Sequence, residues 1–139
     1  MRNILRSVAV PAVLLILAGT ALAQNPDWYQ QREERFRGEH WRARMFAEVK
    51  EDLDHVQSKT FPIGRDEYRI VRTKQQLDEL QNDLAAHRYS EAKLDEVIGT
   101  LQKVVADNRM SGRDRDILNE DLIHLRDYRT HHEVWWNRH

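Results

Sequence analysis

The stretch Leu94 to Val105 (LDEVIGTLQKVV) limits the fold more than any other part of the sequence. Its apolar residues recur in steps of three and four, which places them in one wide stripe along a helix: Leu94, Val97, Ile98, Leu101, Val104 and Val105. Charged and amide residues occupy the remaining faces. A helix of this kind is marginal by itself and must bury its stripe against other elements. The stretch therefore predicts a packed helical protein.

Three further segments carry the same period. We predict helices over residues 28–59, 65–88, 90–107 and 111–136, with no strand pattern between them. The inward residues expected outside the central stripe are Met45, Phe46, Val49, Leu53 and Val56, then Ile70, Thr73, Leu77, Leu80 and Leu84, and finally Leu118, Leu122, Leu125, Tyr128 and His132. The steps of three and four in the second helix are also typical of a coiled coil. Gly38 is expected only to weaken the first helix, by about 1 kcal/mol. The fold class expected is an all-α, up-down antiparallel four-helix bundle.

An offset of 48 residues relates the two halves of the sequence. It places Leu53 on Leu101, Val56 on Val104, and Gly64-Arg65-Asp66 on Gly112-Arg113-Asp114. Matching bundle helices share Leu and Val by heptad phase alone, but phase does not explain the Gly-Arg-Asp triplet. The bundle is thus predicted to consist of two αα-hairpins. Either the second hairpin is a duplicate of the first, or the two match only because their Leu and Val residues share a heptad phase.

Residues 1–23 have the pattern of a secretory signal peptide. Arg2 and Arg6 precede an apolar run, which ends in Ala21-Leu22-Ala23. We expect cleavage before Gln24, one domain over residues 24–139, and a periplasmic or secreted location; a single membrane anchor is the alternative reading. The chain has no Cys, so disulfides and thiolate metal sites are excluded.

Charge and motifs narrow the possible functions. The formal net charge is −1 with both signs interspersed, so nucleic acid is not expected as a partner, and membrane contact is expected only through residues 1–23. No nucleophile elbow or phosphate loop is present, and the protein is expected not to be an enzyme. The helical acids Glu48, Glu51, Asp52 and Glu79 are interpreted as a solvated face. Gly99 is expected to allow close approach of a neighbouring helix.

All four Trp are predicted to gather at one pole, because the two outer helices are expected to be the longest. That pole would hold Trp28, Trp41, Trp135 and Trp136. These rings either close the end of the core or form a docking surface for a protein partner or a second copy.

Histidines near the same pole suggest an alternative function. His40, His131 and His132 are the candidate metal ligands, although no H-x-x-x-H pair is present. Met45 and His124, on the first and last predicted helices, resemble the ligand arrangement of the four-helix b-type cytochromes, and this resemblance implies haem as a cofactor. It departs from that family because Met45 lies well inside the predicted first helix. No cofactor is the first expectation, and a metal- or haem-binding periplasmic bundle is the alternative to an exported protein-binding or self-associating bundle.

Overall fold

The computed structural model describes the backbone of residues 28–137 and the side chains of residues 28–132. The predicted signal peptide lies outside the described residues. The chain divides into two compact units, residues 1–41 and 42–139. The described elements are all helical, and residues 28–137 contain no strand. One domain over residues 24–139 remains a prediction.

The predicted first helix is wrong, because the structure breaks it. Helix α2 covers Trp28–Arg35, a 3-10 turn η3 covers His40–Arg44, and α3 begins only at Met45. Gly38 lies in the break with a φ of 74°. That left-handed conformation cannot continue a right-handed helix, and glycine adopts it without steric cost. The propensity penalty assigned to Gly38 was therefore the wrong measure of its effect.

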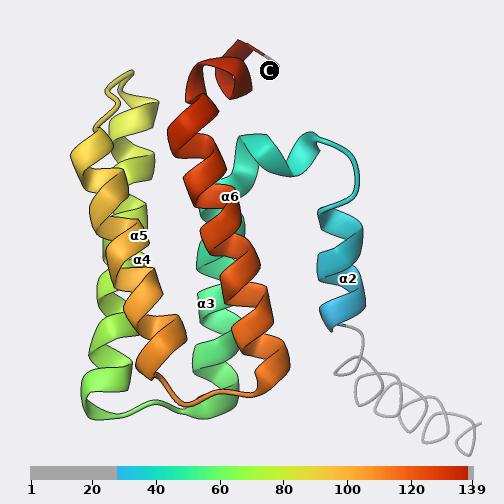
Figure 1. Ribbon diagram of the computed structural model, residues 1–139, viewed down its shortest axis with the longest axis vertical. Helices are drawn as coiled ribbons and strands as arrows, with labels where there is room; N and C mark the ends of the chain where they lie inside the picture. Colours follow the sequence, from blue (N-terminus) through green and yellow to red (C-terminus); the bar gives the residue numbers. More distant parts are fainter. Residues whose placement is uncertain (1–27, 138–139) are drawn as a thin grey trace, which may run out of the picture. The chain divides into compact units, whose positions relative to one another are not determined.

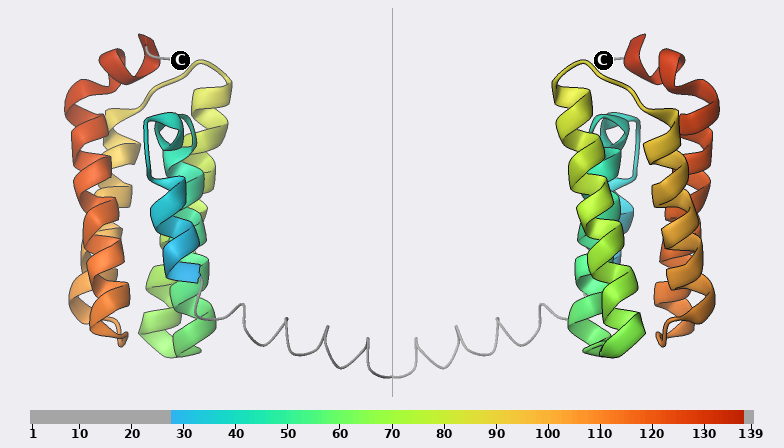
Figure 2. Two further views of the ribbon diagram at one scale, coloured as in Figure 1. Left: turned by 90° about the vertical axis from the view of Figure 1, so that its right-hand side faces the viewer. Right: turned by 90° about the vertical axis from the view of Figure 1, so that its left-hand side faces the viewer.

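The second unit is built from α3 (Met45–Thr60), α4 (Gly64–Ala85), α5 (Glu91–Asp107) and α6 (Gly112–Asn137). The contacts join α3 with α4, α4 with α5, α5 with α6, and α6 with α3, so each helix packs on two others (Figure 1). Figure 2 shows the α3–α4 and α5–α6 turns at one end and the α4–α5 turn at the other.

The predicted core is confirmed within this unit. The central stripe is buried at Leu94, Val97, Ile98, Leu101 and Val104, whereas Val105 is only half-buried. The stripe residues of α3 are all buried, as are those of α4 except half-buried Leu84. On α6, Leu118, Leu122, Leu125 and Tyr128 are buried, and His132 is half-buried. Helical period alone located these residues, because an amphipathic helix turns its apolar stripe toward its neighbours.

Gly99 does not have the role predicted for it. A Cβ added there would meet nothing within 4 Å, so no neighbouring helix needs the missing side chain.

Capping residues and a kink set the ends of the later helices. Ser90 caps α5 by accepting a hydrogen bond from Lys93 N at 3.2 Å, and Ser111 Oγ accepts one from Asp114 N at 3.1 Å. His131 interrupts α6 with a φ of −127°, so the last turn is redirected. None of the helices in the described part of the chain has the length and apolarity needed to cross a bilayer.

Candidate functional site

The Trp and His residues predicted from sequence fall into three groups. Trp28, Trp41 and His40 lie in the first unit, where Trp41 Nε1 donates to Gly38 O at 3.0 Å and the Trp41 ring is 5.4 Å from that of Phe36. The side chains of Trp135 and Trp136 lie outside the described residues. His131 and His132 lie at the kink of α6. A common pole for all four Trp therefore remains a prediction.

A different set of rings meets at the α4–α5 end of the second unit. We name Phe46, Tyr89, Tyr128 and His132 the tyrosine cluster. The Tyr89 ring stacks on the His132 imidazole with centroids 4.2 Å apart, and Tyr128 makes edge contacts with Phe46 at 5.1 Å and with Tyr89 at 6.3 Å. The cluster joins the start of α3, the α4–α5 connection and the end of α6.

Tyr89 is the member of the cluster that sequence analysis missed. It lies in a polar connection between helices, where no periodic pattern selects it; an aromatic ring in such a connection was the only available signal. Burial raises the pKa of Tyr89 above its ordinary value. The buried Tyr89 hydroxyl and His132 Nδ1 have no hydrogen-bond partner among the described residues. Such groups are costly to leave unpaired, so this cluster is a candidate to receive polar atoms from outside.

Charged pairs surround the tyrosine cluster. Arg129, on the turn before the kink, bonds to Asp95 and lies 3.6 Å from Glu91. The bond to Arg129 holds the pKa of Asp95 below its usual range. His131 Nδ1 lies 3.1 Å from Asp127 Oδ1, so the two adjacent imidazoles have different neighbours.

A second polar feature runs along α3 and α6. Its five ionisable side chains are all buried: Glu48, Asp52 and His55 on α3, and Asp114 and Asp121 on α6. Spacings of four, three and seven place each set on one helix face. His55 Nε2 lies 3.1 Å from Asp114 Oδ1, and both side chains are less than a twentieth exposed.

The interpretation of Glu48 and Asp52 as solvated was wrong, whereas Glu51 and Glu79 are exposed as predicted. Charge alone does not place a side chain in water when its helical position faces inward. The spacing of Glu48, Asp52 and His55, read together, was the signal that could have identified the buried set.

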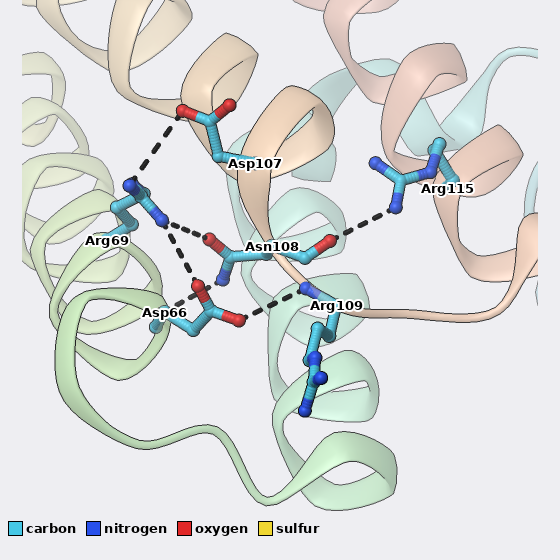
Figure 3. A network of polar contacts seen from close by, with 6 residues as sticks. All are labelled: Asp66, Arg69, Asp107, Asn108, Arg109 and Arg115. Atoms are coloured by element: carbon cyan, nitrogen blue, oxygen red, sulfur yellow. Dashed lines mark hydrogen bonds and ion pairs between the residues drawn. The ribbon is translucent and has the colours of Figure 1, made fainter.

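A polar network joins the start of α4 to the α5–α6 turn, at the end of the second unit that carries the α3–α4 and α5–α6 turns (Figure 3). Asn108 Nδ2 donates to Asp66 O at 2.9 Å, and Arg69 donates to both Asp66 Oδ1 and Asn108 Oδ1. Asp66 Oδ2 also accepts from Arg109 N at 3.1 Å. Arg115 donates to Asn108 O at 3.0 Å. The network therefore connects the start of α4 to the α5–α6 turn, and we assign it a structural role.

Among the described residues, no group of three or more His, Asp or Glu side chains could hold a metal ion. Met45, expected well inside a helix, is instead the first residue of α3, with its side chain buried in the core. Comparison with protein-family models, with curated proteins and with solved structures finds no match to this chain.

Proposed function

We propose that this chain is an exported, non-enzymatic binding protein built as an up-down antiparallel four-helix bundle. The basic, apolar and small-residue pattern of residues 1–23 supports export to the periplasm or beyond. The mutual contacts of α3 to α6 and their short connections support the bundle. Equivalent buried positions such as Leu53 and Leu101 support two duplicated hairpins.

The tyrosine cluster is the observation that carries the binding role. Tyrosine is enriched among the residues that anchor protein interfaces, because one side chain offers both a large ring and a hydroxyl. Tyr89 and His132 are half-buried, come from different segments, and carry polar atoms without partners in the described structure. The partner proposed is a protein or a second copy of this chain. Trp28, Trp41, Trp135 and Trp136 remain its predicted additional contacts.

The proposed role is tested by separating association from folding. Sedimentation velocity over a concentration series, together with co-purification from the exported fraction, would be compared for the wild type, Tyr89→Ala, His132→Ala and Trp135→Ala. We expect each variant to weaken association at least about fivefold with little change in thermal midpoint, consistent with the loss of about 1 kcal/mol of ring contact. Tyr89→Phe keeps the ring and removes only the hydroxyl, so comparing it with Tyr89→Ala separates the contribution of the ring to association from that of the hydroxyl.

Two results would contradict this proposal. One is a monomeric wild type that retains no partner. The other is loss of association only in parallel with loss of folding, which would assign the cluster to the closure of the core.

A metal- or haem-binding bundle is the second candidate. The position of Met45 at the start of α3 brings it nearer to the b-type cytochrome arrangement than the sequence indicated. Calorimetric titration with Zn²⁺, Cu²⁺ and Ni²⁺, with an absorbance scan for a Soret band, tests this alternative. Heat from the metals that disappears in a His131→Ala/His132→Ala variant, or a Soret band lost in Met45→Leu, would support it over partner binding.

A further inference from the structure

Three of the four large hydrophobic side chains that the described structure leaves exposed lie within eight residues of one another. We name Phe61, Ile63 and Tyr68 the apolar tip; their exposed fractions are 81%, 82% and 68%. The first two belong to the α3–α4 turn and the third to the first turns of α4. Single exposed apolar residues are common, but a cluster of this kind marks a contact surface.

The backbone of the turn holds this cluster in place despite a local cost. Phe61 has a φ of 45° and a ψ of 58°, a left-handed conformation that a bulky residue rarely adopts. The Phe61 N–H bonds to Gln57 O at 3.1 Å, and Pro62 follows it. Glycine would adopt this conformation without strain. Neither the strain nor the exposure of the Phe61 ring helps folding, so both point to a role outside the fold.

Cations surround the apolar tip. Lys59 and Arg65 flank the turn on either side, and Arg109 extends from the neighbouring α5–α6 turn; all three are exposed and form no side-chain ion pair within residues 28–132. No acid lies between Lys59 and Arg65.

Three acids at this end are paired within the molecule, although the side chain of one of them, Asp107, is more than half exposed. Asp66 bonds to Arg69 and to Arg109 N, Asp107 lies 3.8 Å from Arg69, and Asp114 faces His55. Glu67 and Asp116 are exposed on the flanks of α4 and α6. Residues 59–65 themselves carry apolar and cationic side chains and no acid, although the whole chain is slightly acidic.

The size of the apolar tip argues against a stable protein interface. Aromatic side chains present about 150–250 Å² each, so three large side chains at these exposed fractions offer roughly 350–600 Å². A specific protein interface buries about 800 Å² on each partner. A small apolar projection flanked by cations instead fits the boundary of a lipid bilayer, where rings and aliphatic groups enter the headgroup region and cations meet anionic lipids.

We propose that the apolar tip binds the surface of a membrane rich in anionic phospholipid. Phe61 and Ile63 enter the headgroup region, Tyr68 lies at its outer edge, and Lys59, Arg65 and Arg109 contact the lipid phosphates. This surface lies at the opposite end of the second unit from the tyrosine cluster, and the proposal does not depend on partner binding there.

Vesicle co-sedimentation of the protein purified after export tests this proposal. The vesicles would be phosphatidylcholine alone, or with about one-third phosphatidylglycerol, at low and high salt. We expect binding only to the anionic vesicles, weakened by salt and reduced at least about tenfold in Phe61→Ser/Ile63→Ser. Lys59→Glu/Arg65→Glu should lose about fivefold or more for each cation.

Matched controls separate the apolar tip from general surface effects. Ile123→Ser removes an exposed apolar side chain from α6, and Lys103→Glu reverses an exposed cation on α5; both should bind as the wild type does. Every variant shares the same N-terminal segment, so that segment cannot produce a difference between them. Circular dichroism would confirm that each variant is folded.

Three outcomes would overturn the proposal. The wild type could fail to bind anionic vesicles, or the Phe61→Ser/Ile63→Ser variant could bind as the wild type does. Alternatively, the substitutions could abolish self-association while leaving vesicle binding intact, which would assign the apolar tip to contact between copies.

Discussion

Helices α4 and α6 both begin with Gly-Arg-Asp, yet the two copies are held by different means. At the start of α4, Gly64 has a φ of +60°, Ile63 provides no side-chain cap, and Asp66 bonds across to the α5–α6 turn. At the start of α6, Gly112 does not have a positive φ, Ser111 supplies the cap, and Asp114 is buried against His55 of α3. The same Gly-Arg-Asp triplet therefore begins both helices, while the surroundings of each triplet determine what its residues contact.

The largest expected effect tests whether the two halves are equivalent in their core. Leu53 and Leu101, related by the offset of 48, are both fully buried. Leu53→Ala and Leu101→Ala should each lower the free energy of unfolding by about 2–5 kcal/mol, measured by urea denaturation. A loss below roughly 0.5 kcal/mol at Leu101 would show that the central stripe is not core, and widely different losses would argue against equivalent halves.

The next largest effect is expected at Asp114 and Asp66, whose substitution should lower the free energy of unfolding by different amounts. Asp114→Ala leaves His55 buried without this partner and should cost about 3 kcal/mol. Asp66→Ala acts at a side chain that is about one-quarter exposed and should cost about 1–2 kcal/mol. A double-mutant cycle with His55→Ala isolates the first contact. Equal costs for the two aspartates would mean that their different surroundings do not matter.

The two glycines should give a smaller difference. Gly64→Ala places a Cβ on a left-handed residue and should cost about 1–2 kcal/mol. Gly112→Ala meets open space without that strain, so stability should stay the same or rise by at most about 0.5 kcal/mol. Thermal midpoints of the two variants, measured side by side, check this. A destabilised Gly112→Ala would show that the second start also depends on glycine.

The smallest effect concerns Asp83 and Asp95, two acids that lie outside both helix starts. Their ion pairs contribute to the acid dependence of stability on which any difference between the two helix starts is superimposed. Bonds to Lys93 and Arg129 lower the pKa values of Asp83 and Asp95, respectively. Because these values are lowered in the folded state, the stabilisation is complete above the ordinary aspartate pKa and is lost as pH falls through the folded value. Asp95→Asn should flatten the acid side of a plot of urea midpoint against pH.

The part of the fold that could be predicted is the part that helical period reports directly. Leu94, Leu101 and Ile70 are buried because their spacing places them on the inward face of a helix. The starts of α5 and α6 could be predicted from Ser90 and Ser111, because a capping hydrogen bond joins residues only a few positions apart. Both kinds of inference require only neighbours within a few residues.

The rest depended on contacts that sequence does not record. The break at Gly38 was missed because propensity gives a cost per residue and not a backbone angle. The burial of Asp52 was missed because it is determined by surroundings that are distant in sequence. Tyr89 joined the candidate site only when the fold brought its connection against the end of α6. The left-handed Phe61 had no local signal beyond the proline that follows it.

The polar network around Asn108 also affects where a protease would cleave this protein. Trypsin must draw out several residues around an arginine before cutting, and exposed connections are its usual targets. Arg109 is exposed, yet its own amide is bonded to Asp66 and the preceding carbonyl to Arg115, so the chain there cannot be pulled out without releasing α4. Arg88, in the α4–α5 connection, bonds to Asp83 of the preceding helix, and the neighbouring Tyr89 contacts α6 by ring stacking. Brief digestion should therefore nick the molecule between its two hairpins and leave the turn at Arg109 intact.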